Sequence, residues 1–177
     1  MLIEAISTPR LVLIPLTVDQ LVMYLERETD FYRQVCPASR EILTNHLKRA
    51  IGMKLERMIP APRQDLPWLT YWLIKVPPDG FGAGMIGFKG APDERGEVEI
   101  SYGIDSAFRN QGYTTEAVEG MILWAFQDSR CNRILAPDTL RSNLASNRVL
   151  NKLGMRVYEE KVDSLSWCLD RDQGSVA

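Results

Sequence analysis

The residues with the clearest chemical potential lie in the run Arg-Asn-Gln-Gly-Tyr-Thr-Thr-Glu-Ala that begins at Arg109. This run joins a predicted strand that ends near Ile104 to a predicted amphipathic helix. A loop at such a junction directs unpaired backbone N–H groups and the positive end of the helix dipole at one point, which suits an anion such as a pyrophosphate. Gly112 lets the backbone approach the anion closely, and Arg109 adds a charge-assisted hydrogen bond. An ordinary helix start capped by Thr114 or Thr115 fits the same residues, and spacing alone leaves both interpretations open.

The sequence has few residues that could form other kinds of catalytic or metal site. His46 is the single histidine, and the three cysteines are widely spread with no Cys-x-x-Cys pair. The sequence therefore argues against a histidine-based triad, a disulfide framework and a zinc site, and it predicts no metal. Gly82–Gly87 matches the dinucleotide pattern Gly-x-Gly-x-x-Gly, but that pattern needs a helix to open inside it. A strand end and a turn follow instead, so we interpret these glycines as residues of strand packing.

The composition is that of an ordinary soluble domain. The chain has 177 residues, of which 45% are hydrophobic and 25% charged, so we expect a single domain over residues 1–177 with its own core. With 21 basic and 23 acidic residues the net charge is −2, and no overall field favours nucleic acid or an anionic membrane. Because no basic segment leads into a long apolar run at the start and the cysteines are isolated, we expect a cytoplasmic protein.

The first part of the chain predicts helices between antiparallel strands. We expect a strand over Arg10–Pro15, a helix capped by Thr17, and a longer helix over Ser39–Met58 whose first residue is its cap. Trp68–Val76 and Phe81–Lys89 then form a hairpin around a Pro-Pro-Asp-Gly turn.

The second part alternates strands and helices. Apolar residues recur at strand spacing or at helical spacing, and Gly154 ends the last helix. The expected elements are strands over Glu97–Ile104, Arg133–Ala136, Met155–Glu160 and Ser164–Asp170, and helices over Thr115–Asp128 and Asn143–Leu153. Antiparallel strands followed by a strand–helix–strand–helix unit predict an α/β fold, with one mixed sheet and helices on both faces.

Two motifs of the second part resemble the GNAT superfamily of N-acetyltransferases. Arg109-x-x-Gly112-x-Thr114 resembles its acyl-CoA loop, R/Q-x-x-G-x-G/A, with Thr in place of the usual Gly or Ala. Asn143–Met155 is similar to the N-x-x-S-x-R-V-L-x-K-L-G-F helix of the RimJ/RimL-like branch, the ribosomal-protein-alanine N-acetyltransferase-like members.

Two further segments strengthen the resemblance. Thr8–Leu13 resembles the T-x-R-L-x-L opening of that branch, and Glu99–Tyr102 resembles its E-I-G-Y strand. Nearly the whole chain is covered except Phe31–Pro67, a segment that varies with substrate in the family. The resemblance implies the GNAT acyl-CoA N-acyltransferase fold, a mostly antiparallel sheet with a splayed central strand pair.

The resemblance also implies that acetyl-CoA binds where Glu97–Ile104 and Arg133–Ala136 splay apart, with the Arg109–Thr114 loop around its pyrophosphate. Asn143 and Ser146 share one side of a helix start and would meet the pantetheine. The expected cofactor-binding residues are Tyr102, Ile104, Arg109, Asn110, Gln111, Gly112, Tyr113, Thr114, Asn143 and Ser146.

Glu99 is the expected general base. Amine acetylation must remove an ammonium proton, stabilise an oxyanion and supply a proton to the departing thiolate. Glu99 alternates with apolar neighbours, and in a sheet covered on both faces its side is not simply bulk solvent. Glu97, Glu159, Glu160 and water are the alternatives.

Ser146 is the expected second catalytic residue. Its hydroxyl begins a helical stripe whose other members are apolar. Many GNAT enzymes carry a tyrosine acid seven residues after the asparagine, and here that position is Leu150. As the branch resemblance implies, Ser146 would serve as the acid in its place, with solvent as the alternative.

We therefore expect an acetyl-CoA-dependent N-acetyltransferase that acts on a primary amine, either a small molecule or a protein N-terminus, by direct attack with general-base assistance. A CoA-binding regulatory or interaction module with little or no transferase activity is the alternative, which Leu150 keeps open. We expect neither nucleic acid nor a membrane as partner, and a monomer or homodimer.

Overall fold

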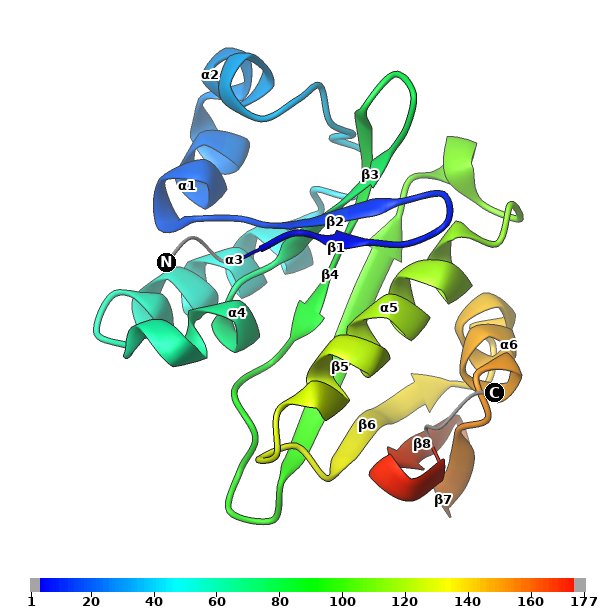
Figure 1. Ribbon diagram of the computed structural model, residues 1–177. Coiled ribbons are helices and arrows are strands. Elements are labelled where there is room, and N and C mark those ends of the chain that lie inside the picture. The colour runs from blue at the N-terminus through cyan, green and yellow to red at the C-terminus, as the bar shows by residue number, and fades with distance from the viewer. Residues whose placement is uncertain (1–3, 174–177) are drawn as a thin grey trace.

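The computed structural model describes residues 4–173, which form one sheet of eight strands with helices on both faces (Figure 1). The order across the sheet is β1-β2-β3-β4-β5-β6-β8-β7, and all neighbours are antiparallel except β5 and β6. The mixed α/β sheet expected from the sequence is thereby confirmed. The strands are β1 (Ile6–Ser7), β2 (Val12–Pro15), β3 (Trp72–Val76), β4 (Phe81–Phe88), β5 (Glu97–Ile104), β6 (Arg133–Leu140), β7 (Arg156–Glu160) and β8 (Ser164–Asp170).

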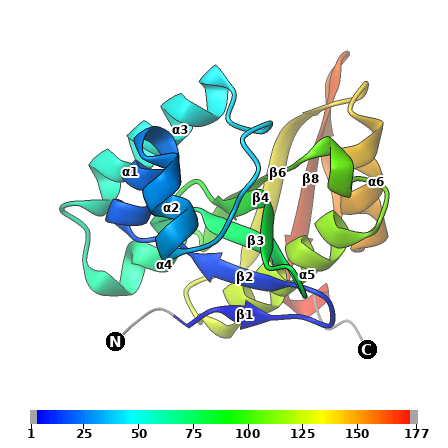
Figure 2. The same ribbon diagram turned by 90° about the horizontal axis from the view of Figure 1, so that it is seen from above.

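The sheet lies between two groups of helices. The helices are α1 (Val18–Glu26), α2 (Glu28–Gln34), α3 (Asn45–Met58), α4 (Leu66–Leu69), α5 (Tyr113–Gln127) and α6 (Leu144–Lys152). Figure 2 shows α1, α2 and α3 on one side of the sheet and α5 with α6 on the other. Val98 and Ile100 of β5 belong to the core cluster that includes Val118 and Met121 of α5. Within residues 4–173, no helix is both long and apolar enough to cross a membrane.

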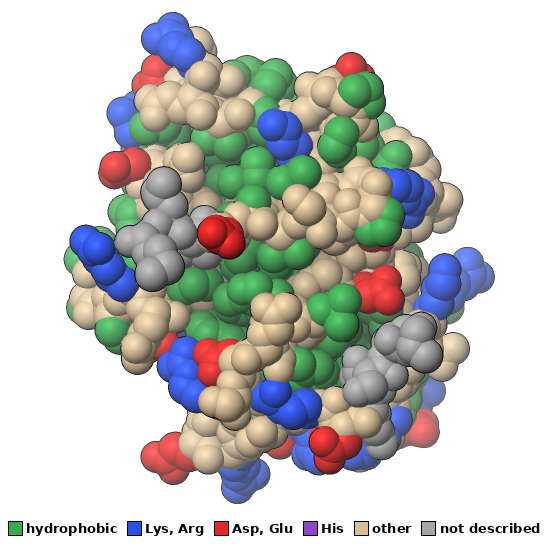
Figure 3. Space-filling model, in the orientation of Figure 1, with side chains coloured by type: hydrophobic (Ala, Val, Ile, Leu, Met, Phe, Trp, Pro, Cys, Tyr) green, Lys and Arg blue, Asp and Glu red, His purple; other side chains and the backbone are tan. Residues whose placement is uncertain are grey.

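The face that carries α5 also has a groove of about 650 Å³ between β1 and that helix. Ile6, Leu123 and Trp124 contribute apolar surface to it, and Leu123 is 50% exposed. Figure 3 shows apolar side chains near the middle of this face and charged side chains mostly around its rim. This groove shares no lining residue with the cleft described below.

Strands β5 and β6 separate after a short stretch of pairing. They pair through only three positions, the last of which is Glu99 opposite Leu135. Beyond it, β5 continues along β4 as far as Ile104, whereas β6 continues along β8 with an irregularity between Ala136 and Thr139. The sheet is therefore open between the second halves of β5 and β6, at the place where the sequence predicts a splayed pair.

The observed bounds agree with the prediction for β5 and β8 and shift at other elements. Strand β2 begins at Val12 because Arg10 lies in the turn from β1, a short edge strand that the sequence does not signal. Strand β6 continues to Leu140 because it keeps pairing with β8 as far as Ser164. Helix α5 begins at Tyr113, two residues before its predicted start.

The predicted helix over Ser39–Met58 is wrong in its first part. Helix α3 begins after Thr44, whose side chain accepts a hydrogen bond from the Leu47 N–H. Ser39 lies in an extended segment, where its N–H donates to the Gly82 carbonyl and its hydroxyl donates to Asp105. Because other elements take both polar groups, Ser39 does not cap a helix.

The predicted strand over Trp68–Val76 begins only at Trp72. Trp68 belongs to the short helix α4, which has Pro67 in its first turn, a position that favours a helix start. The ring of Trp68 packs 4.6 Å from that of Trp124 on α5. Aromatic residues are therefore buried here through helix–helix contact rather than through strand pairing.

The glycines of Gly82–Gly87 lie within β4, and no helix opens among them. A Cβ at Gly87 would lie 2.7 Å from the Thr70 carbonyl oxygen, and one at Gly82 would lie 2.8 Å from the Leu73 side chain. Close packing against neighbouring segments explains both residues, so the interpretation as strand packing is confirmed and the dinucleotide interpretation is excluded.

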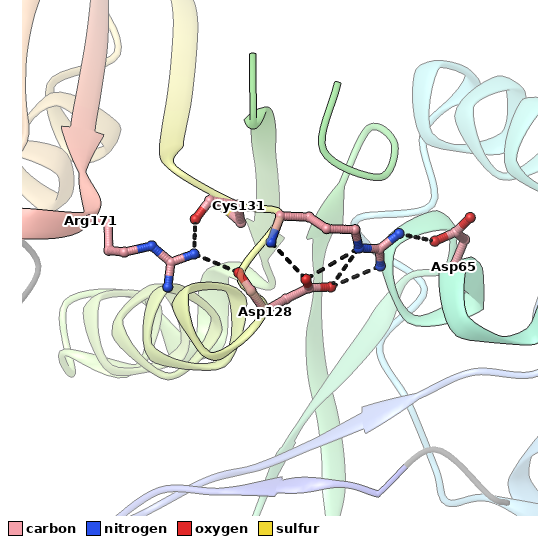
Figure 4. Close-up of polar contacts among 5 residues, drawn as sticks. Asp65, Asp128, Cys131 and Arg171 are labelled. Carbon is pink, nitrogen blue, oxygen red and sulfur yellow. Dashed lines mark hydrogen bonds and ion pairs between the residues drawn. The ribbon is translucent and has the colours of Figure 1, made fainter. Parts of the chain in front are cut away.

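A network of arginines fixes the C-terminal end of α5 (Figure 4). Arg171, which follows β8, donates to the backbone carbonyls of Phe126 and Asp128. Arg130 pairs with the Asp128 carboxylate at 2.8 Å and with Asp65 at 2.7 Å. Carbonyls at a helix end lack intrahelical partners, so Arg171 satisfies two of them, while Arg130 connects the helix end to Asp65 through ion pairs.

Lys54 of α3 is a buried amine in contact with the sheet. Its residue is 6% exposed, and Nζ donates to the carbonyls of Leu69 at 2.9 Å and of Phe88 at 2.5 Å. Burial, together with the nearby charge of Arg57, lowers the pKa of Lys54 to about 7. A neutral amine keeps two N–H groups, one for each carbonyl, so both hydrogen bonds survive deprotonation.

We predict that the free energy of unfolding rises between about pH 7 and pH 8.5 because of Lys54. In this range the unfolded chain still binds the Lys54 proton and the folded chain releases it, so stability increases with pH. Relative to Lys54→Met, the wild-type protein should gain on the order of 1 to 2 kcal/mol, measured by urea denaturation at both pH values. Subtracting the free energy of unfolding of Lys54→Met from that of the wild type at each pH cancels the contributions of all other titrating groups. Parallel pH dependence of the two proteins would contradict the assignment.

Candidate functional site

A cleft of about 780 Å³ adjoins the opening between β5 and β6. Four parts of the chain line it: the end of β5, the loop and first turn of α5, the first turn of α6, and the segment between α2 and α3. Nine of the ten residues expected to bind the cofactor lie in this lining, namely Tyr102, Ile104, Arg109, Asn110, Gly112, Tyr113, Thr114, Asn143 and Ser146. The fold therefore brings two distant motifs to one surface.

Gln111 is the exception, and its side chain points away from the cleft. Its Nε2 donates to the Ala107 carbonyl at 3.0 Å, and its own carbonyl accepts a hydrogen bond from Arg10 at 2.9 Å. Because the Ala107 carbonyl engages the side-chain amide and the Arg10 guanidinium engages the backbone carbonyl, the expectation that the Gln111 side chain contacts the cofactor has no support in this geometry.

The first turn of α5 is not capped by a side chain. Gly112 is the N-cap residue, in a left-handed conformation with φ +82°, and neither Thr114 nor Thr115 caps the helix. Asn110 is also left-handed, with φ +60°. A helix start without a side-chain cap keeps N–H groups available to an anion, and the dipole of this 15-residue helix favours negative charge there.

The structure gives a reason for glycine at position 112 that the sequence does not show. The sequence suggests that a side chain there would obstruct the anion. In the structure, a Cβ on Gly112 would lie 3.1 Å from an Arg10 guanidinium nitrogen. The left-handed φ and the contact with Arg10 both favour glycine at this position.

Asparagines fix the first turn of α6. Asn143 caps the helix by accepting a hydrogen bond from the Ser146 N–H at 3.2 Å, while it also lines the cleft. Asn147, which the sequence analysis missed, donates to the Leu140 carbonyl at 2.8 Å and accepts from the Trp167 indole at 3.0 Å. These bonds attach the start of α6 to the end of β6 and to the middle of β8.

Tyr102 and Ser146 meet across the cleft. Burial raises the pKa of the Tyr102 phenol, and a hydrogen bond from Ser146 offsets part of that rise. Leu150, at the position of the family's usual tyrosine, is 1% exposed and belongs to the core. The Tyr102 and Ser146 hydroxyls therefore both lie at the cleft, whereas Leu150 does not line it.

Glu99 does not line the cleft. It is the last residue of β5 that pairs with β6, and it alternates with Ile100, which faces α5. Its Oε2 is shielded from solvent and makes no hydrogen bond among the described residues. Lys89 approaches this oxygen as an ion pair, without the alignment of a hydrogen bond. Glu99 thus lies at the fork of the two strands, on the face of β5 opposite α5.

The other candidate carboxylates have arginine or lysine partners. Glu97 lies 3.2 Å from Arg133, and Glu160 lies 2.7 Å from Arg141. Glu159 is exposed and lies 3.8 Å from Lys161. Within residues 4–173, three or more metal-ligating side chains do not come together.

The segment between α2 and α3 contributes a wall that sequence reasoning did not find. Glu41 and Thr44 line the cleft, and the Glu41 carboxylate accepts from the Ser106 hydroxyl at 2.7 Å. The Ser39 hydroxyl holds the pKa of Asp105 below its usual range. No motif marks these residues, because their role depends on contact between distant segments.

Arg148 of α6 is a second cleft cation beside Arg109. Both side chains are exposed, and Arg109 lies 3.9 Å from Glu41. The sequence signal for Arg148 is its place in the Asn-x-x-Ser-x-Arg pattern, two residues after Ser146. The cleft therefore has the chemistry of a site for an elongated phosphate-bearing ligand. It combines two guanidinium groups and uncapped N–H groups with the apolar walls of Ile104 and Val149.

Comparison with known proteins identifies the family. Residues 10–156 match a family described as "Acetyltransferase (GNAT) domain". The chain therefore belongs to the GNAT family of acetyltransferases. An uncharacterized N-acetyltransferase of Bacillus subtilis (strain 168), YjdG, is 34% identical over 97 residues, which are 54% of this chain and 56% of that protein. The aligned region thus spans just over half the length of this relative.

Solved structures share the fold. An acetyltransferase of the GNAT family from Bacillus anthracis has a TM-score of 0.62 and 18% sequence identity, over 96% of this chain and 99% of that chain. RimL, a ribosomal L7/L12 alpha-N-protein acetyltransferase solved in complex with coenzyme A, has a TM-score of 0.61 and 16% identity, over 94% of this chain and 98% of that chain. The GNAT fold expected from the resemblance is confirmed.

We predict that Gly112→Ala weakens acetyl-CoA binding by tenfold or more, because the new Cβ presses on Arg10 and the left-handed turn relaxes. Gly154→Ala is the matched control, since Gly154 has a similar φ of +75° and open space around its Cβ. Both variants should lose about 1 kcal/mol of stability, but only Gly112→Ala should lose affinity. Calorimetric titration with acetyl-CoA measures the difference. Equal affinities in the two variants would remove the loop from the binding site.

Proposed function

We propose that the protein transfers an acetyl group from acetyl-CoA to a primary amine, and that the two substrates meet at the fork of β5 and β6. The observation that carries this proposal is the placement of two kinds of chemistry on opposite faces of one opening. The anion-binding loop and the start of α6 lie on the α5 side, and the Glu99 carboxylate lies on the other.

The cofactor side of the site binds acetyl-CoA, which supplies the acetyl thioester. Arg109 and the uncapped start of α5 hold the pyrophosphate, and Tyr102 and Ile104 border the path toward the fork. Arg148 supplies a further positive charge for the phosphates. Asn143 and Ser146 lie closer to the pantetheine, because the first turn of α6 faces the end of β5 across the cleft.

Glu99 acts as the general base toward the amine. Its shielded Oε2 has unused capacity to accept a hydrogen bond, which an incoming ammonium group supplies. The ammonium replaces Lys89 as the ionic partner, and the carboxylate then takes its proton directly or through water. A negative charge at this position also favours a cationic acceptor over a neutral one.

Ser146 assists the leaving group. Its hydroxyl donates a hydrogen bond or a proton to the departing thiolate, and the Tyr102 phenol lies beside it. The acceptor is a small-molecule amine or a protein N-terminus. The second class takes support from RimL, which shares the fold and is described as an alpha-N-protein acetyltransferase. A screen of amines and N-terminal peptides for release of the CoA thiol tests the activity and chooses between the two classes.

We predict that Glu99→Gln lowers kcat about 10²-fold or more at neutral pH and leaves acetyl-CoA affinity nearly unchanged, because only proton removal is lost. Glu97→Gln is the matched control, since Glu97 projects from the same face of β5 and pairs with Arg133. Steady-state kinetics with the acceptor from the screen measure both. Near-normal turnover of Glu99→Gln would transfer the role to water or another carboxylate.

We predict that Ser146→Ala lowers kcat about tenfold to a hundredfold, because its hydrogen bond strengthens as charge develops on sulfur. Stability should fall by only about 1 kcal/mol, since the substitution removes one oxygen and adds no bulk. Ser142→Ala, in the exposed turn before α6, is the control and should retain full activity. An unchanged kcat in Ser146→Ala would leave solvent as the proton source.

A further inference from the structure

The Thr8-Pro9-Arg10 segment lies against the loop before α5, where Arg10 meets Gln111 and Gly112. Figures 1 and 2 both show the turn between β1 and β2 beside the start of that helix. The segment is about a hundred residues away from the loop in the sequence, and its side chains do not line the cleft.

Thr8 and Arg10 bind the carboxylate of Glu116 from several directions. The Thr8 hydroxyl donates to Oε1 at 2.6 Å, the Arg10 backbone N–H donates to the same oxygen at 2.7 Å, and the Arg10 Nε donates to Oε2 at 2.7 Å. The Glu116 side chain is 11% exposed. Burial alone would raise its pKa, but the bonds from Thr8 and Arg10 hold the pKa below its usual range. Glu116 is therefore a charged group in the first turn of α5.

Arg10 also contacts three consecutive residues of the loop. A terminal nitrogen donates to the Gln111 carbonyl at 2.9 Å, and the guanidinium lies 4.9 Å from the centre of the Tyr113 ring. The other terminal nitrogen lies against Gly112, at the position where a Cβ would project. The contacts come from one planar group whose donors have fixed directions.

These contacts have two consequences for an anion at the helix start. The carbonyl and the N–H of a trans peptide point in opposite directions, so a Gln111 carbonyl held toward Arg10 directs the Gly112 N–H to the other side of the loop. Gly112 itself lines the cleft. A carboxylate in the first turn also repels an incoming phosphate, and the paired guanidinium cancels that charge.

We propose that Arg10 is a positioning residue for acetyl-CoA: through Gln111 and Glu116 it sets the direction of the loop N–H groups and neutralises the carboxylate beside them, without touching the ligand. This inference rests on the proposed role of the Arg109–Thr114 loop. It gives a physical function to the Thr-x-Arg pattern at the start of the chain.

The test is acetyl-CoA affinity in Arg10→Gln. The dissociation constant should rise tenfold or more, whereas kcat at saturating acetyl-CoA and KM for the amine should stay within about twofold, because neither the base nor the acceptor side changes. Arg10→Lys should recover part of the affinity, since an ammonium neutralises Glu116 but lacks the fork that also holds Gln111.

Arg130→Gln is the matched control, because Arg130 makes comparable ion pairs at the opposite end of α5. It should retain wild-type affinity for acetyl-CoA. An equal loss of affinity in Arg130→Gln would reduce Arg10 to a general stabiliser of the helix and overturn the proposal. If Arg10→Gln binds normally while Gly112→Ala does not, the positioning role alone fails. If neither variant binds more weakly, the loop assignment itself fails.

Discussion

The parting of β5 from β6 after Glu99 is the constraint on which the site depends. A continuous sheet would satisfy every backbone group between these strands and leave no passage from one face to the other. Because β5 stays with β4 and β6 stays with β8, each strand keeps a partner and the opening remains stable. The opening has a loop suited to phosphates on the α5 side and the Glu99 carboxylate on the other. Direct transfer between two substrates needs this kind of meeting point.

Helix α5 is held differently at its two ends, and the difference has functional meaning. Arg171 and Arg130 satisfy the groups at its C-terminal end, so that end is a fixed structural anchor. The N-terminal end has Gly112 in place of a capping side chain, so its N–H groups have no side-chain partner and suit an anion. Arg10 contacts this end through the Gln111 carbonyl and the Glu116 carboxylate. The helix is thus rigid enough to aim its dipole and open enough to bind an anion.

The segment between α2 and α3 connects the acceptor side to the loop before α5. Ser39 bonds Asp105, and Glu41 bonds Ser106, so two residues of this segment contact the turn that leads into Arg109. A wall of the cleft is therefore attached to the turn that precedes the proposed phosphate-binding loop.

The sequence by itself determined the elements and most of the cleft, because helical and strand periodicity, the turn glycines and the short motifs are local signals. Nine of the ten expected binding residues line the cleft; seven of them belong to two such motifs, and Tyr102 and Ile104 belong to the strand before the loop. The tertiary structure decided what depends on contact between distant segments. Periodicity cannot show that Leu150 packs in the core while Ser146 faces the cleft, that the Gln111 side chain turns away, or that Glu99 lies at the fork. Nor can it pair Arg10 with Glu116, 106 positions apart, since only packing of the first hairpin against α5 brings their charges together.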